Sequence, residues 1–159
     1  MTYINWSTWT PKDKATLGFI RQGDRVLLIR KKRGLGAGKI NGFGGKLEPE
    51  ELPLAAIQRE AEEELRIQLV DPVPVGELNF QFTDGYGLSC TVFLITQFTG
   101  KPTATPEADP FWFPISELPF DEMWADDRLW LRDALEGKRF RGFFAFSGDT
   151  MLTQLIEWL

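Results

Sequence analysis

Three glutamates at helical spacing offer the clearest chemistry in this sequence. Glu60, Glu63 and Glu64 occupy positions i, i+3 and i+4 in the run REAEEEL, so a helix would place their carboxylates on one face. The apolar stripe of that helix lies elsewhere, which leaves this face free to meet solvent or a ligand. A hard divalent cation would turn the mutual repulsion of the carboxylates into binding. A solvated acidic face is the alternative that the helix alone leaves open.

The absence of two residue types narrows the available chemistry. The 159 residues include no histidine and a single cysteine, Cys90. Zinc sites built on imidazole, Ser-His and Cys-His catalytic arrangements and an internal disulfide are therefore excluded. Acid-base and metal chemistry must fall to Asp, Glu, Lys, Tyr or water.

A second group of residues could recognise a purine base. Trp124 and Phe80 offer flat surfaces for stacking, and Asn41 carries both a donor and an acceptor. Asp126 and Asp127 are adjacent carboxyls, and proximity with partial burial would raise one pKa. A protonated aspartate donates as well as accepts, so the pair could match a guanine-type or an adenine-type edge. Helix capping by Asp126, and core positions for the aromatic residues, remain the alternatives.

The charge distribution is uneven along the chain. The net charge is −5, from 18 basic and 23 acidic residues, which argues against binding to polymeric nucleic acid. Residues 30–46 hold six basic side chains and no acid, whereas residues 47–66 hold seven acids and two arginines. This order suits an anionic, metal-bound ligand, with two solvated faces as the alternative. Neither a leader sequence nor a long apolar run is evident, so we expect a cytoplasmic protein without a membrane partner.

The elements that must position these residues can be read from their patterns. Residues 16–21 and 25–30 predict a β-hairpin around Gly23, and residues 52–65 predict a helix with Pro53 in its first turn. Between them, residues 34–45 contain six glycines, too many for a regular helix or an ordinary strand. Close approach of the backbone to a ligand would explain them, as would a flexible loop.

The second half of the chain alternates strands with one helix. Strands are predicted at residues 78–82, 88–98, 111–113 and 143–146, with a linker at 102–106 and a helix from Asp126 to Glu136 that ends at Gly137. Residues 151–159 fit a strand or a short helix equally well. Together these elements predict a single domain, residues 1–159, of the α+β class. Its architecture would be an α/β/α sandwich, with a mixed sheet packed between helices.

The spacing around the glutamates resembles the Nudix box. That motif is a glycine, five residues, Glu, seven residues, Arg-Glu, an aliphatic, one residue and Glu-Glu. The small Ala61 occupies the aliphatic position. Arg66 replaces the usual glycine before the final aliphatic residue, and this replacement affects the helix end more than the metal ligands. The matching positions here are Gly45, Glu51, Arg59, Glu60, Glu63 and Glu64.

The resemblance implies attack of water on a diphosphate linkage, with Mg²⁺ as the cofactor and Mn²⁺ as a possible substitute. It implies that Glu60, Glu63 and Glu64 are metal ligands, joined by the carbonyl of Gly45. Glu51 would support the metal site, and Arg59 would orient a glutamate through a bidentate pair.

Four segments outside the box narrow the resemblance to the MutT-homologue oxidised purine nucleoside triphosphatases. They are KKRGLGAGKINGFGGK (31–46), FQF (80–82), PFDEMWADDRLW (119–130) and GFFAFSGDT (142–150). In that subfamily the positions of Asn41, Trp124, Asp126 and Asp127 contact the base. Thr16, Phe80 and Met123 match other pocket positions, Lys31 matches a phosphate-side lysine, and Glu107 matches a glutamate near the metal and the attacking water. Leu35 and Ile40 replace aromatic residues and would reshape the pocket wall.

The resemblance therefore predicts an enzyme. It would convert oxidised purine (deoxy)nucleoside triphosphates, such as 8-oxo-dGTP and 2-oxo-dATP, to the monophosphate and pyrophosphate and so sanitise the nucleotide pool. Its partner would be a small nucleotide, and we expect a monomer. The alternatives are a Nudix hydrolase of another nucleotide, a non-catalytic nucleotide-binding module and a plain structural domain.

Overall fold

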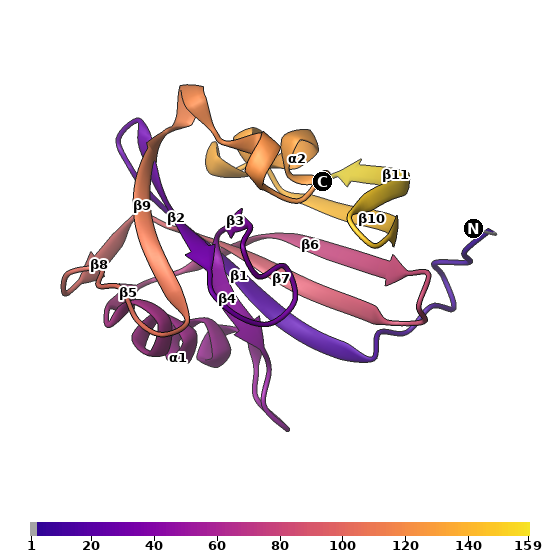
Figure 1. The fold of residues 1–159 in the computed structure, drawn as a ribbon, viewed down its shortest axis with the longest axis horizontal. Helices are drawn as coiled ribbons and strands as arrows, with labels where there is room; N and C mark the ends of the chain where they lie inside the picture. The colour runs from indigo at the N-terminus through magenta and orange to yellow at the C-terminus, as the bar shows by residue number, and fades with distance from the viewer. Residues whose placement is uncertain (1–2) are drawn as a thin grey trace.

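A mixed nine-stranded sheet with a helix on each face forms the body of the computed structural model, which describes residues 3–159 (Figure 1). The sheet has the order β11-β10-β6-β7-β1-β2-β3, with β4 also paired to β1 and β9 to β2, and β5 and β8 form a separate pair. The helices are α1 (Pro53–Leu65) and α2 (Asp127–Leu135). The strands are β1 (Asp13–Gln22), β2 (Arg25–Lys31), β3 (Ile40–Asn41), β4 (Phe43–Lys46), β5 (Gln68–Val70), β6 (Val73–Phe82), β7 (Gly87–Ile95), β8 (Gln97–Thr99), β9 (Ala108–Pro114), β10 (Phe140–Ser147) and β11 (Thr150–Trp158).

Parallel and antiparallel pairs alternate across the sheet. β1 runs parallel to β7 and β10 runs parallel to β6, whereas the other pairs are antiparallel. Between Gln22 and Arg25 the hairpin of β1 and β2 turns through two residues. The predicted hairpin and the predicted mixed sheet are both confirmed.

The central strands bury both of their faces, because successive side chains point to opposite sides of a sheet. Phe19 and Leu28 pack in one hydrophobic cluster with Trp130 of α2. Their neighbours Ile20 and Leu27 pack in a second cluster with α1. In Figure 1 the two helices accordingly lie on opposite sides of the sheet. This arrangement is the predicted α/β/α sandwich.

The two helices begin and end close to the predicted positions. α1 has Pro53 at its start and ends at Leu65, where Arg66 adopts the left-handed conformation (φ 61°, ψ 36°). α2 ends one residue earlier than predicted, at Leu135. The side chain of Asp126 does not cap α2. It instead accepts a hydrogen bond from Nε1 of Trp130 at 2.9 Å, so the capping interpretation of Asp126 is wrong.

The glycine-rich segment departs from its prediction. Residues 40–41 and 43–46 form β3 and β4, although six glycines in residues 34–45 argued against an ordinary strand. β4 pairs with β1, and Gly44 lies so close to it that a Cβ at this position would stand 2.0 Å from the carbonyl oxygen of Thr16. The glycines therefore serve close packing of β4, as well as the loop before it.

Two further differences concern strands. The predicted run at 88–98 is broken, because β7 ends at Ile95 and β8 begins at Gln97 as part of the smaller sheet. The ambiguous residues 151–159 form the strand β11, which pairs with β10 at the edge of the main sheet. Neither helix in the described part of the chain is long and apolar enough to cross a membrane.

Candidate active site

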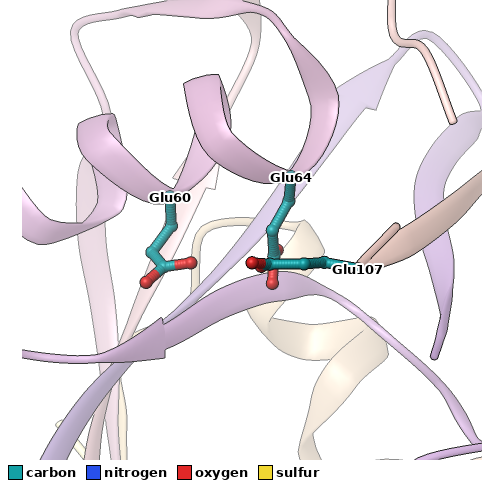
Figure 2. Close-up of side chains that lie close together, drawn as sticks. All are labelled: Glu60, Glu64 and Glu107. Atoms are coloured by element: carbon teal, nitrogen blue, oxygen red, sulfur yellow. The ribbon is translucent and has the colours of Figure 1, made fainter. Parts of the chain in front are cut away.

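Three carboxylates from two separate segments meet at one side of α1. Glu60 and Glu64 project from α1, and Glu107 projects from the segment just before β9, as Figure 2 shows. One oxygen atom of each carboxylate lies within 4.8 Å of an oxygen of the others. Carboxylate oxygens at this separation fit a hard divalent cation, which takes several oxygen ligands.

The side of α1 that carries this cluster is packed against the sheet. Glu60 and Glu64 are only 7% and 3% exposed, so the alternative of a solvated acidic face is wrong for these two residues. Gly44 of β4 donates its backbone N–H to Oε2 of Glu64 at 2.9 Å. A Cβ at Gly45 would stand 2.6 Å from Oε1 of Glu60, so glycine is required for β4 to approach the cluster.

Thr105 joins the Glu107 segment to the end of α1. Its buried hydroxyl donates to the carbonyl oxygen of Glu64 at 2.8 Å and accepts the N–H of Glu107 at 3.3 Å. On the other side, the N–H of Lys32 donates to the carbonyl oxygen of Glu107 at 3.0 Å. These bonds hold the third carboxylate opposite the two from the helix.

Arg59 organises the neighbouring carboxylates. Its guanidinium donates to both oxygens of Glu51 at 2.8 Å, to Glu60 at 2.9 Å and to Glu63 at 3.0 Å. The bond to Glu51 raises the pKa of Arg59 and lowers that of Glu51 to about 2. Glu63 is half-exposed and paired with Arg59, outside the cluster of three. The orienting geometry expected of Arg59 is present, and its role and that of Glu63 as a ligand stay predictions.

Burial dominates the electrostatics of the cluster. It raises the pKa of Glu60, and it raises that of Glu64 to about 8 even though the Gly44 N–H acts in the opposite direction. Repulsion from Glu63 and Glu107 also raises the pKa of Glu60, which Arg59 lowers, and repulsion from Glu60 and Glu107 raises that of Glu64. Buried carboxylates whose charge is not fully balanced are unfavourable, so this oxygen set suits a bound divalent cation.

A cavity of about 290 Å³ adjoins the cluster at β4. It is lined on one side by Gly44 and Gly45, which contact the carboxylates of α1, and on the other by residues preceding and beginning α2. Met123 does not line it and is buried in the hydrophobic cluster against which Trp124 packs. The residues predicted from the sequence that line the cavity are Thr16, Lys31, Asn41, Phe80, Trp124, Asp126 and Asp127.

The aspartate pair at the far end of the cavity is almost completely buried. Asp126 is 0% and Asp127 is 2% exposed. Oδ1 of Asp126 and Oδ2 of Asp127 have no hydrogen-bond partner among residues 3–159. Burial raises the pKa of both carboxyls, and their mutual repulsion raises that of Asp127 further. Unpaired buried oxygens are unfavourable unless a ligand satisfies them, which makes this end of the cavity suited to a polar edge.

Comparison with known proteins decides the family. The family model described as NUDIX domain matches residues 11–134. The chain belongs to the NUDIX family. The resemblance that the box predicted is thereby confirmed.

Individual Nudix proteins cover most of this chain. Two curated relatives, from Danio rerio and Mus musculus, are named oxidized purine nucleoside triphosphate hydrolase and are 40% and 38% identical over 140 residues, which is 87% of this chain and 90% of each relative. A MutT protein from Bacillus halodurans superposes with a TM-score of 0.80 at 25% identity, covering 91% of this chain and 97% of its own. A MutT NUDIX hydrolase from Burkholderia pseudomallei gives 0.69 at 29% identity, covering 81% and 98%.

The Nudix cavity also contains residues that the sequence did not single out. Leu78 and Phe82 line it beside Phe80. Alternate residues of a strand share one face, so the alternating pattern of β6 could have predicted both residues. Tyr86 lines it as well, and no local pattern indicated it, whereas Lys46, which also lines the cavity, belongs to the basic stretch of residues 30–46. Of the two replaced aromatic positions, Leu35 lines the cavity, whereas Ile40 is buried in the core. The expected change of the pocket wall at Ile40 is therefore wrong.

Proposed function

We propose that this Nudix protein hydrolyses oxidised purine nucleoside triphosphates to the nucleoside monophosphate and pyrophosphate, with Mg²⁺ as its cofactor. The observation that carries the proposal is one cavity lined both by Gly44 and Gly45, which contact the carboxylate cluster, and by Asp126 and Asp127, each of which has a buried oxygen without a hydrogen-bond partner in the described residues. The names of the 40% and 38% identical relatives support the same substrate class.

At the phosphate end, Glu60, Glu64 and Glu107 would hold the cation. When bound, the cation neutralises phosphate oxygens and makes a water molecule a better nucleophile. Lys31 lines the cavity, and its ammonium would attract the polyphosphate. Arg59 fixes Glu60 and Glu63 through the bonds described above, which keeps these side chains in one geometry as the substrate binds.

At the base end, the side chains provide stacking and edge recognition. Trp124 would stack on the purine, and the amide of Asn41 would bind an edge of the base. The raised pKa values of Asp126 and Asp127 favour the protonated form of at least one carboxyl. A neutral carboxyl next to a charged one presents a donor and acceptors together, which suits the altered edge of an oxidised purine.

A second candidate is a Nudix enzyme that prefers another nucleotide. Leu35 lines the cavity in place of the aromatic residue expected from the resemblance, which would change the fit around the base. The phosphate end would be the same in both cases. A monomeric state, a cytoplasmic location and a single domain over the whole chain stay predictions.

Turnover of a panel of nucleotides tests the proposal. The protein is incubated with Mg²⁺ and with normal and oxidised purine triphosphates, and monophosphate and pyrophosphate are quantified. We expect faster turnover of 8-oxo-dGTP or 2-oxo-dATP than of dGTP and dATP. Absence of turnover with every nucleotide would exclude the enzyme, and equal turnover of dGTP and 8-oxo-dGTP would exclude the preference. Asp126→Asn should alter the order of preference while Mg²⁺ binding is retained.

A further inference from the structure

The N-terminal segment before β1 contacts one wall of the cavity. Trp9 lies outside the residues 11–134 that the family model matches. Figure 1 shows this segment running past the turn that joins β6 to β7. That turn lies between Phe82 and Tyr86, and both of these aromatic residues line the cavity.

Gln81 connects Trp9 to the backbone of the turn. Nε1 of Trp9 donates to Oε1 of Gln81 at 2.7 Å. Nε2 of Gln81 in turn donates to the carbonyl oxygens of Phe82, at 2.9 Å, and of Tyr86, at 3.2 Å. One amide side chain thus ties the tryptophan to the two residues that present aromatic rings to the cavity.

Lys12 of the same segment and Asp13, the first residue of β1, contact the start of β7 and the end of the turn. The N–H of Lys12 donates to the carbonyl oxygen of Gly87 at 2.9 Å. The hydroxyl of Tyr86 donates to Oδ2 of Asp13 at 2.8 Å, which fixes the ring from its outer end. A Cβ at Gly87 would stand 3.1 Å from the indole of Trp9, so a side chain at this position would have to displace that ring slightly.

The wall continues from the turn to the base end. The Phe82 ring lies 6.1 Å from that of Tyr86 and 6.0 Å, edge to face, from that of Trp124. Contacts of this kind add to the packing of aromatic rings. A shift of the turn would therefore move the aromatic surface that faces the ligand, while the carboxylates on α1 lie against β4 and remain in place.

We propose that Trp9 and Asp13 are positioning residues of the nucleotide cavity, which fix Phe82 and Tyr86 through Gln81 and the tyrosine hydroxyl and thereby set the fit of the base. This inference rests on the proposed function, because it takes the cavity as the nucleotide site. Trp9 does not line the cavity, so its effect on the base would pass through Phe82 and Tyr86. A shift of this aromatic wall should therefore change the affinity for the base more than the rate of the hydrolytic step.

The test compares Trp9→Phe with Trp6→Phe. Trp9→Phe keeps a ring and removes the N–H donor to Gln81. Trp6→Phe makes the same change in the same segment, at a ring that packs on Trp9 and Phe143 and makes no hydrogen bond to the turn. Because the lost bond is to a part-buried neutral group, we expect Trp9→Phe to raise KM for the oxidised triphosphate by about 3- to 10-fold. The same variant should change kcat by less than about twofold, and Trp6→Phe should change neither.

A double variant tests the route through Gln81. Gln81→Leu removes both ends of the connection, so Trp9→Phe combined with Gln81→Leu should raise KM no further than Gln81→Leu alone. Additive effects, equal KM values for the Trp9 and Trp6 variants, or a fall in kcat without a change in KM would each overturn the inference. Calorimetric titration with 8-oxo-dGMP measures binding directly and should show the same loss of affinity for Trp9→Phe.

The outcomes separate this inference from the proposed function. If the unmodified protein neither hydrolyses nor binds any nucleotide, the proposed function fails and the inference fails with it. If the unmodified protein is active and Trp9→Phe behaves like Trp6→Phe, only the inference fails. Thermal melting of each variant identifies those that do not fold, and Tyr86→Phe, which removes only a hydroxyl, provides an independent change at the same wall.

Discussion

The four glutamates around α1 divide into two environments that the sequence spacing does not distinguish. Glu60 and Glu64 are buried against β4 and face Glu107, whereas Glu63 is half-exposed and held by Arg59. The guanidinium of Arg59 pairs with Glu63 and also with Oε1 of Glu60 at 2.9 Å, whereas Glu64 forms no salt bridge in the described part of the chain. The burial therefore singles out Glu64 as the residue whose charge most needs a cation.

Replacement of Glu64 by glutamine removes the ionisable carboxyl and keeps a side chain of nearly the same size and shape. Glu64→Gln should raise the thermal stability of the metal-free protein at neutral pH, because burial raises the pKa of Glu64 to about 8 and folding of the variant no longer requires protonation of an ionised carboxylate. It should also abolish the additional stability that Mg²⁺ confers. Turnover should fall by at least about 100-fold, as expected when a metal ligand is lost. Scanning calorimetry with and without Mg²⁺ and a turnover assay measure the two effects.

A matched control lies on the same helix. Glu62 is exposed and makes no contact with the cluster, so Glu62→Gln should leave both the response to Mg²⁺ and turnover unchanged. Glu63→Gln should also reduce turnover, with a much smaller effect on the free energy of unfolding. Full activity of Glu63→Gln would contradict the ligand role predicted from the box, and full activity of Glu64→Gln would contradict the role inferred from its position.

Among the secondary-structure elements, α1 shows how a departure from the motif is accommodated. Arg66 stands where the box usually has a glycine, and it adopts the left-handed conformation at the end of the helix. Its N–H still bonds to the carbonyl oxygen of Glu62 at 3.1 Å, and the N–H of Ile67 bonds to that of Ala61 at 3.4 Å. The helix end is therefore geometrically intact, and the cost of the arginine is conformational strain rather than a misplaced carboxylate.

Relief of that strain is a direct test. Arg66→Gly should increase the free energy of unfolding by roughly 0.5–1 kcal/mol, because a non-glycine residue costs about 1–2 kcal/mol in this conformation and glycine loses more entropy on folding. Turnover should stay the same, since the carboxylates of α1 do not move. Denaturant titration measures the change. Arg66→Ala keeps a Cβ and should give no such gain, so equal stability of the two variants would contradict the strain.

For the molecule as a whole, the buried acids make stability depend on pH. Burial raises the folded-state pKa of both Asp126 and Asp127 above the ordinary value of 3.8, and repulsion from Asp126 raises that of Asp127 further. The folded state therefore binds more protons than the unfolded state at any pH between the two values. By linkage, stability from this pair is fully present below about pH 4 and is lost as pH rises through the raised pKa.

Replacement of one aspartate isolates this contribution. In the absence of metal, the free energy of unfolding of the unmodified protein should fall between pH 4 and pH 8. For Asp127→Asn this fall should be smaller by more than about 1 kcal/mol, since each pKa unit corresponds to about 1.4 kcal/mol. Denaturant titrations across that range provide the measurement. Asp121→Asn is the control, because the Asp121 side chain is fully exposed. Parallel pH curves for Asp127→Asn and the unmodified protein would show that the pair carries no such linkage.

The sequence by itself determined the local features of this protein. The spacing of Gly45, Glu51, Arg59 and the glutamates identified the family, and apolar periodicity located both helices and the main strands, because residues close in sequence share one face of an element. The sandwich followed from the order of those elements. Segments in which propensity and packing disagree, such as the glycine-rich β4, were assigned wrongly.

Only the tertiary structure decided which distant residues meet. Glu107 joins a cluster with residues of α1 more than forty positions earlier in the chain, and Trp9 reaches Gln81 across 72 positions. The structure also decided that Glu60 and Glu64 are buried while Glu63 is not. The physical reason is that burial and long-range contact depend on which faces of separate elements pack together. Local spacing fixes the face of a helix but not what lies against it.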